Sequence, residues 1–386
     1  MKEKIEKLSL IVTRNTWTLF VFSLLLIICS RFFMYVLYII FDWGETGNFV
    51  YDINNIWDNN WYKAIANQGY QIEPNGHDKG DAANWAFFPA VPILLGVIKK
   101  CIGLPIEIIA FVVNSFLLVL TIIVAMKYII LTRKNKVLAL EFALLLAFGP
   151  YTFYCSCMYT ESLYLLLTFL SFYFLKKKNY IVMGICGALL SATRNTGIFF
   201  VFVIAIECVM NKWKNNRSVV QVIKNILGNS KLVLGTSLVP MGLFGYMAYL
   251  RYLVGDSLAF VRIQKAWQQP RTNPISKAIE YFQSENIRDW YIVILVIVVL
   301  FLIGYQVKRG KITEMFMPFL IIAIQSTSMY VSMPRYLFST GMIELGMLEY
   351  INNEWPRHKH ILFFLILVIL SVLFLKLWFL GDTLMR

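Results

Sequence analysis

Long apolar runs separated by short polar segments dominate the chain. A helix needs about 20 apolar residues to cross a bilayer, and the runs predict about eleven such spans. The predicted spans are 17–41, 104–131, 137–155, 160–175, 180–193, 196–210, 232–254, 290–307, 313–331, 336–352 and 361–380. We therefore expect an all-α polytopic membrane protein in which residues 1–386 form a single transmembrane domain.

Two longer segments interrupt this pattern and predict outer loops, at 42–103 and 255–289. The first begins with an acidic stretch, which is typical of an outer face. Its apolar part, 85–100, is short and contains two prolines, so we expect a juxtamembrane helix rather than a crossing. In the second loop, residues 258–267 mix apolar and basic side chains and predict an interfacial helix.

Composition agrees with a membrane protein. Apolar residues make up 59% of the chain and charged residues only 15%, against roughly 25% charged in a soluble domain. A cytosolic enzyme, a disordered protein and a disulfide scaffold are thereby excluded. With most of these runs in the lipid, little mass remains outside the bilayer.

The net charge of +14 has a topological explanation. If 85–100 does not cross, five basic clusters fall on the inner side, as the positive-inside rule requires, and the N-terminus is cytoplasmic. This clustering between apolar runs argues against a nucleic-acid partner, which needs a basic groove with interleaved aromatic residues. The clusters are 133–136, 176–178, 212–231, 308–311 and 357–360.

Four charged residues converge on the outer end of the predicted bundle: Asp58, Glu161, Arg194 and Arg335. Ionisable groups at a membrane are functional candidates by default. Two cations and two carboxylates at one depth fit a site that handles an anionic substrate and a proton. Interfacial ion pairs that fasten helix ends are the alternative interpretation. Arg31, inside the first span, either pairs helices or lines a cavity.

The first outer loop holds the richest local pattern. Trp57, Trp61 and Ile65 are spaced by four and predict one apolar helical stripe on the membrane surface. Tyr62 follows Asp58 by four residues and shares its face. Such a helix would hold the Asp58 carboxylate just above the lipid headgroups. An interfacial helix with a solvated aspartate explains the local pattern equally well.

No metal site or cofactor is expected. Cys155 and Cys157 are the one close pair of cysteines, and neither a second pair nor a histidine cluster accompanies them. No carboxylate cluster has the form of a metal cage. We therefore expect metal-independent chemistry.

Four motifs in order resemble a known family. Residues 57–70 read WDNNWYKAIANQGY, 87–92 read FFPAVP, 149–150 and 159–163 read GP and YTESL, and 194–197 read RNTG. Over about residues 15–210 the chain resembles the PIG-V family, the GPI mannosyltransferases that add the second mannose, within the GT-C glycosyltransferase superfamily. The chain departs at RNTG, where the family more often has Asn directly before Gly.

The resemblance implies a GT-C-like bundle whose active site opens on the outer face. It implies inverting transfer of mannose, or a similar hexose, from a polyprenyl-phosphate sugar to an acceptor hydroxyl. Asp58 matches the position of the general base, and Arg194 is expected to hold the donor phosphate, with Arg335 added from its depth. Further expected substrate contacts, for positioning, stacking on sugar or anchoring, are Glu161, Tyr62, Trp57, Tyr70 and Asn195.

Other functions stay open at this point. A lipid-linked-sugar flippase or another transporter is one alternative, although no internal repeat supports it. Another GT-C enzyme, such as a protein O-mannosyltransferase or a cell-wall glycosyltransferase, is a second, and a non-catalytic subunit a third. The acceptor is a glycolipid, a polysaccharide or a protein. Short loops favour a prokaryotic plasma membrane.

Overall fold

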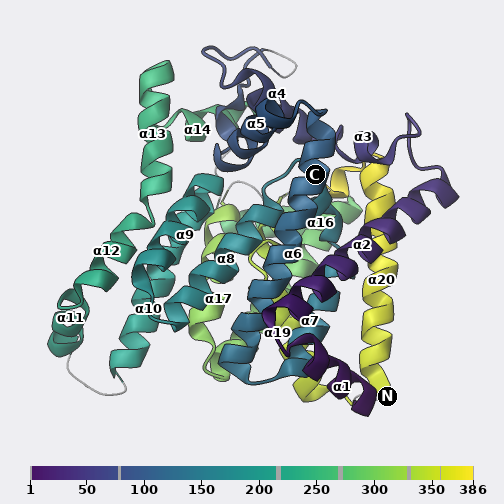
Figure 1. Cartoon of the computed structure of the whole chain (residues 1–386). Helices are drawn as coiled ribbons and strands as arrows, with labels where there is room; N and C mark the ends of the chain where they lie inside the picture. Colours follow the sequence, from purple (N-terminus) through teal and green to yellow (C-terminus); the bar gives the residue numbers. More distant parts are fainter. Residues whose placement is uncertain are drawn as a thin grey trace. The chain divides into compact units, whose positions relative to one another are not determined.

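The computed structural model describes residues 2–76, 80–213, 219–267, 273–327, 332–356 and 358–385. Parts of five expected features, at 77–79, 214–218, 268–272, 328–331 and 357, lie outside these residues. Within them every regular element is helical, apart from an isolated bridge between Gly76 and Ala82 (Figure 1). The all-α prediction is therefore confirmed.

The chain divides into two compact units that alternate along the sequence. The first comprises Met1–Asn67, Ile93–Phe169 and Glu344–Arg386, and the second Gln68–Pro92 and Leu170–Ile343. Helix α8 (Glu161–Lys176) contributes residues to both. The single transmembrane domain stays a prediction.

The first unit is built around α6, which packs against α2, α3 and α7. In Figure 1, α1 lies at one end of this unit and α3, α4 and α5 lie at the other. The end of α20 lies beside α3. The helices of this unit are α1 (Lys2–Val12), α2 (Thr16–Phe41), α3 (Phe49–Ile53), α4 (Asn59–Gln68), α5 (Ala90–Ile102), α6 (Ile106–Arg133), α7 (Lys136–Phe148), η2 (Thr152–Ser156), α19 (Met342–Glu354), α20 (His358–Phe379) and η5 (Thr383–Met385).

Local sequence sets the ends of these helices. Asn15 caps α2 by accepting from the Thr18 N–H, and the Thr18 side chain completes a capping box. Helix α7 ends at Phe148, although the apolar run predicted a helix to 155. The prediction was wrong because Pro150 disfavours helical backbone at Gly149, which is extended. Residues 149–160 are consequently a connection between α7 and α8.

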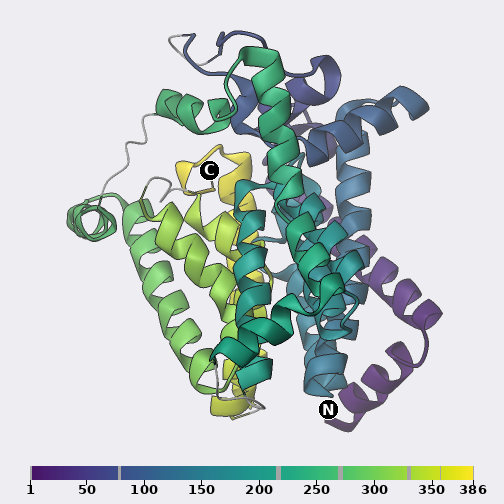
Figure 2. The same ribbon diagram turned by 90° about the vertical axis from the view of Figure 1, so that its left-hand side faces the viewer.

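In the second unit, α9 packs against α12 and α13, and α17 packs against α10 and α16. Figure 2 shows α16 and α17 as neighbouring green helices. Gly184 and Gly235 let α9 and α12 approach closely, since a Cβ on Gly184 would lie 2.2 Å from the Gly235 carbonyl oxygen. The elements are η1 (Asn84–Ala86), α9 (Tyr180–Thr193), η3 (Asn195–Phe199), α10 (Phe200–Trp213), α11 (Val219–Leu227), α12 (Ser230–Leu238), α13 (Met241–Val254), α14 (Ala259–Arg262), η4 (Ile263–Trp267), α15 (Pro274–Gln283), α16 (Ile287–Lys308), α17 (Ile312–Gln325) and α18 (Met333–Phe338).

In the described part of the chain, four helices are long and apolar enough to cross a membrane: α2, α6, α16 and α20. The bent pair α12 and α13 makes a fifth if it counts as one span, with a bend of 40° at the break that contains Pro240. The chain is therefore an integral membrane protein. Helix α5, with 13 residues, is shorter than a crossing needs.

The second outer loop differs from its prediction. The interfacial helix expected at 258–267 is only a four-residue α14 followed by η4, because its apolar residues pack inside the protein. Phe260 and Ile263 are buried in one cluster with Trp85, Phe88 and Tyr246. The amphipathic helix of the loop is instead α15, which exposes Ile275, Ile279 and Phe282 along one face.

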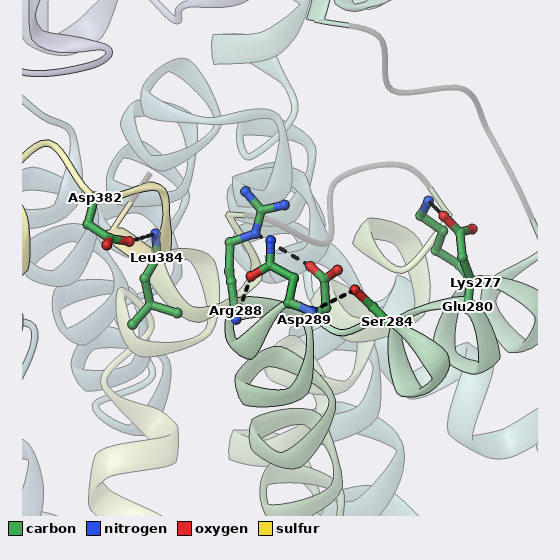
Figure 3. A network of polar contacts seen from close by, with 8 residues as sticks. Lys277, Glu280, Ser284, Arg288, Asp289, Asp382 and Leu384 are labelled. Carbon is green, nitrogen blue, oxygen red and sulfur yellow. Dashed lines mark hydrogen bonds and ion pairs between the residues drawn. The ribbon is translucent and has the colours of Figure 1, made fainter.

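Hydrogen bonds fix the junction between this loop and α16 (Figure 3). Asn286 caps the helix by accepting from the Arg288 N–H at 2.9 Å, and its own N–H donates to the Ser284 hydroxyl at 3.1 Å. Asp289, in the first turn, pairs with Arg288 at 3.5 Å. An acid at this position also interacts favourably with the helix dipole.

Candidate functional site

The chain turns sharply immediately before Asp58. Trp57 has φ +54°, in the left-handed region that side chains rarely adopt. The Asp58 carbonyl then accepts the first N–H groups of α4, from Trp61 at 3.1 Å and from Tyr62 at 3.3 Å. The helix thus begins after Asp58, so Trp57 is not part of the helical stripe that its spacing predicted. Unusual backbone of this kind is concentrated at functional sites.

A buried tyrosine fixes the backbone of Asp58. The Asp58 N–H donates to the Tyr159 phenol oxygen at 3.2 Å. The Tyr159 ring stacks on Tyr154 at 5.8 Å, meets the edge of Trp378 at 5.6 Å and lies 6.1 Å from the Tyr62 ring. Two of the motifs that carry the family resemblance therefore meet in the first unit. Trp378 had no signal in the sequence beyond its apolar run.

Glu161 begins α8 and is buried in the same unit. Burial raises the pKa of the Cys155 thiol to about 12, while the charge of Arg31 lowers it and the carboxylates of Glu161 and Glu344 raise it. These three ionisable side chains thus lie near enough to Cys155 to act on its thiol. Sequence reasoning had not selected Glu344.

Arg31 is buried in the first unit and hydrogen-bonds to neutral groups. Its guanidinium donates to the Ser115 hydroxyl at 3.1 Å and to the Cys155 carbonyl at 3.2 Å. From α6, the Asn114 side chain donates to the Cys157 carbonyl at 2.5 Å. These contacts join α2 and α6 to the connection that precedes Tyr159, and they favour the interpretation that Arg31 pairs helices.

In the second unit, Arg194 lies where α9 ends and η3 begins. Its guanidinium donates to the Ser339 hydroxyl at 2.8 Å and lies 4.8 Å from the centre of the Tyr336 ring. Arg335 lies 5.9 Å from the centre of the same ring. Both arginines are nearly inaccessible to solvent, at 5% and 7% exposure. The two predicted cations therefore meet around one tyrosine, Tyr336, which the sequence analysis had not selected.

The RNTG segment packs tightly against the end of α9, the helix that precedes it. A Cβ on Gly197 would lie 2.4 Å from the Leu190 carbonyl oxygen, so only glycine fits there. The Gly197 N–H donates to the Arg194 carbonyl at 2.9 Å. This turn fixes the backbone of Arg194. Asn195, the next residue, is exposed.

Tyr70 belongs to the second unit and is fastened inside it. Its hydroxyl donates to the Phe87 carbonyl at 2.7 Å, and its ring lies 5.5 Å from Tyr246 and 5.6 Å from Tyr249. Of its two expected roles, these contacts favour anchoring over stacking on a sugar.

The predicted residues are thus distributed over both units. Asp58, Trp57, Tyr62 and Glu161 belong to the first, and Arg194, Asn195, Arg335 and Tyr70 to the second. Within the residues that the structure describes, no group of three or more His, Cys, Asp or Glu side chains could hold a metal ion.

Comparison with known proteins extends these observations. Among curated proteins, none matches the chain. The family model described as Mannosyltransferase (PIG-V) matches residues 46–380. This match runs through the C-terminal half, beyond the part covered by the four motifs, and it confirms the resemblance. A membrane protein with these motifs and this match is a glycosyltransferase by family, and the chain belongs to the PIG-V mannosyltransferases.

Proposed function

We propose that the protein transfers mannose from a polyprenyl-phosphate donor to an acceptor hydroxyl, with inversion, on the outer face of the membrane. The family supports mannosyl transfer itself. The observation that carries the choice of donor is the pair of buried guanidinium groups at Tyr336. Two cations gathered at one ring suit an anionic phosphate, a group that guanidinium side chains bind well.

The reaction needs one base. The acceptor oxygen attacks the anomeric carbon, the bond to the donor phosphate breaks, and its electron pair leaves with the phosphate. A phosphate monoester of a lipid departs without a general acid, but the attacking hydroxyl must lose its proton. Asp58 accepts this proton. Its half-exposed position and its fixed backbone support this role.

Arg194 and Arg335 hold the donor phosphate and stabilise the charge that develops on it as the bond breaks. Guanidinium groups suit phosphate because they donate two parallel hydrogen bonds. Glu161 positions neighbouring groups or binds sugar hydroxyls. Trp57 and Tyr62 stack on the sugar or anchor the loop, and Asn195 contacts substrate from its exposed position.

The proposal includes a GT-C-like bundle of about eleven spans, with the shorter apolar helices α9, 195–210 and α17 among them. The N-terminus is cytoplasmic, and the membrane is a prokaryotic plasma membrane. The reaction uses no metal or cofactor. The acceptor is a glycolipid, a polysaccharide or a protein.

The test uses purified protein, radiolabelled polyprenyl-phosphate mannose and a membrane lipid extract. Labelled product is expected, and it identifies the acceptor at the same time. Asp58→Asn should abolish transfer, whereas Asp81→Asn, at an exposed aspartate of the same predicted loop, should not. Movement of donor across vesicles without product would instead support a flippase. Substantial turnover by Asp58→Asn would refute the assignment of the base.

A further inference from the structure

Lys63 connects three segments around Asp58. It lies on α4, five residues after Asp58, and its ammonium forms an ion pair with Glu107. The same ammonium donates to the Asn55 side chain at 3.3 Å and lies 5.5 Å from the centre of the Tyr51 ring. One cation therefore links α4, α6 and the segment that leads from α3 into the turn at Trp57.

The Glu107 end of this pair is buried. Glu107 lies in the first turn of α6 and is 2% exposed. A buried carboxylate is strongly unfavourable without a partner, so removal of the lysine leaves an uncompensated charge. When side-chain atoms alone are counted, Lys63 is 29% exposed and Glu107 is 3% exposed. The lysine thus reaches from the surface to a fixed point at the end of the central helix.

The placement of these contacts relative to Asp58 suggests what they do. Asn55 precedes the left-handed residue Trp57 by two positions, and Lys63 follows it by six. The lysine therefore holds the chain on both sides of the turn against α6. Tyr159 fixes the Asp58 N–H from a different element. Two independent contacts thus fix the backbone around Asp58.

We propose that the ion pair of Lys63 and Glu107 positions Asp58 for proton abstraction. The inference rests on the proposed function of Asp58 and adds two positioning residues to it. Neither residue touches the reacting atoms, so their loss should reduce the rate of the chemical step and leave donor binding unchanged. A small misplacement of a catalytic group can reduce the rate about 100-fold.

The experiment uses the full-length protein and compares Lys63→Met, Glu107→Gln, Lys63→Arg, the single reversals Lys63→Glu and Glu107→Lys, and the double variant Lys63→Glu/Glu107→Lys that swaps the charges. Lys99→Met is the matched control, because Lys99 contacts Asn67 at the opposite end of α4. We expect kcat to fall about 100-fold in the first two variants, with the donor KM within twofold of wild type. Lys63→Arg should retain most activity, and the swap should recover at least tenfold over either single charge reversal.

The outcomes separate this inference from the proposed function. If wild type transfers mannose and Asp58→Asn is inactive, but Lys63→Met keeps wild-type kcat, only the positioning role is overturned. A swap without recovery, or a donor KM that rises in step with the loss of kcat, also overturns it. If wild type itself transfers no mannose, the proposed function fails. Thermal unfolding in detergent identifies any variant that has simply lost its fold. If Lys63→Met is such a variant, Lys63→Arg decides: retained activity supports the positioning role, and loss of activity in folded protein overturns it.

Discussion

The indole N–H of Trp378 donates to the backbone carbonyl of Ile53 at 3.2 Å, across 325 positions of sequence. The bond fastens the end of α20 to the end of α3, in the unit that contains Asp58. Trp378 is fully buried and also contacts the Tyr159 ring. A single side chain thus supports both the segment before Asp58 and the tyrosine that binds its N–H.

Trp378→Phe should lower the stability of the protein. The change leaves the Ile53 carbonyl without this donor in a buried place, which costs about 1–3 kcal/mol. Thermal unfolding in detergent measures the effect. Trp17→Phe serves as the control because Trp17 is largely exposed. Equal melting temperatures for the two variants would contradict the structural role of Trp378.

Tyr159→Phe should slow the reaction and preserve the fold. It removes the acceptor of the Asp58 N–H but keeps the ring that stacks on Tyr154 and meets the edge of Trp378. We expect kcat to fall about tenfold, as for the loss of one hydrogen bond. Tyr154→Phe is the matched control, since its hydroxyl donates to the Met385 carbonyl instead. A larger effect in the control than in Tyr159→Phe would refute this role.

Arg194→Lys should weaken use of the donor. Lysine keeps the charge but loses the planar fork that binds phosphate and stacks on a ring such as Tyr336. We expect the donor KM to rise about tenfold, measured by initial rates over a range of donor concentrations. Arg251→Lys, at an exposed arginine of the same unit, should leave KM unchanged. An unaltered KM in Arg194→Lys would exclude phosphate binding by this residue.

Cysteine labelling tests the orientation in the membrane. Cys101 is exposed near the end of α5, whereas Cys29, which is also exposed, lies inside the apolar span α2. Cys155 is buried with a pKa raised to about 12. Because the thiolate is the reactive form, a membrane-impermeant maleimide added to intact cells should label wild type and not Cys101→Ser. If Cys101 reacts only after the cells are permeabilised, α5 lies on the cytoplasmic side and the proposed topology is wrong.

Sequence reasoning identified the elements whose signal is local. The apolar runs predicted α2, α6, α16 and α20, because length and hydropathy suffice for such helices. The same reasoning missed the end of α7, where Gly149-Pro150 outweighs an apolar run that continues beyond it. In the second loop it placed the amphipathic helix too early, since apolar residues that pack on protein and those that face lipid look alike.

In the candidate site, too, sequence reasoning found some residues and missed others. Glu161, Arg194 and Arg335 could be selected because a charge in or beside an apolar run is visible in the sequence, and Asp58 because of the motif that contains it. Their supports could not be selected. Tyr159 begins the YTESL motif, but its bond to Asp58 could not be predicted from that motif. Tyr336 and Trp378 look like ordinary core residues, and their contacts depend on the folded chain.

The alternation of the two units along the chain affects biosynthesis. The first unit needs residues from 344 onward, among them Trp378, which are translated after the second unit. While the ribosome is still making the second unit, the segment around Asp58 therefore lacks part of its packing. Large proteins usually fold domain by domain during synthesis. This unit cannot do so before the second unit has been made. The environment of Asp58 is complete only after α20 has been synthesised.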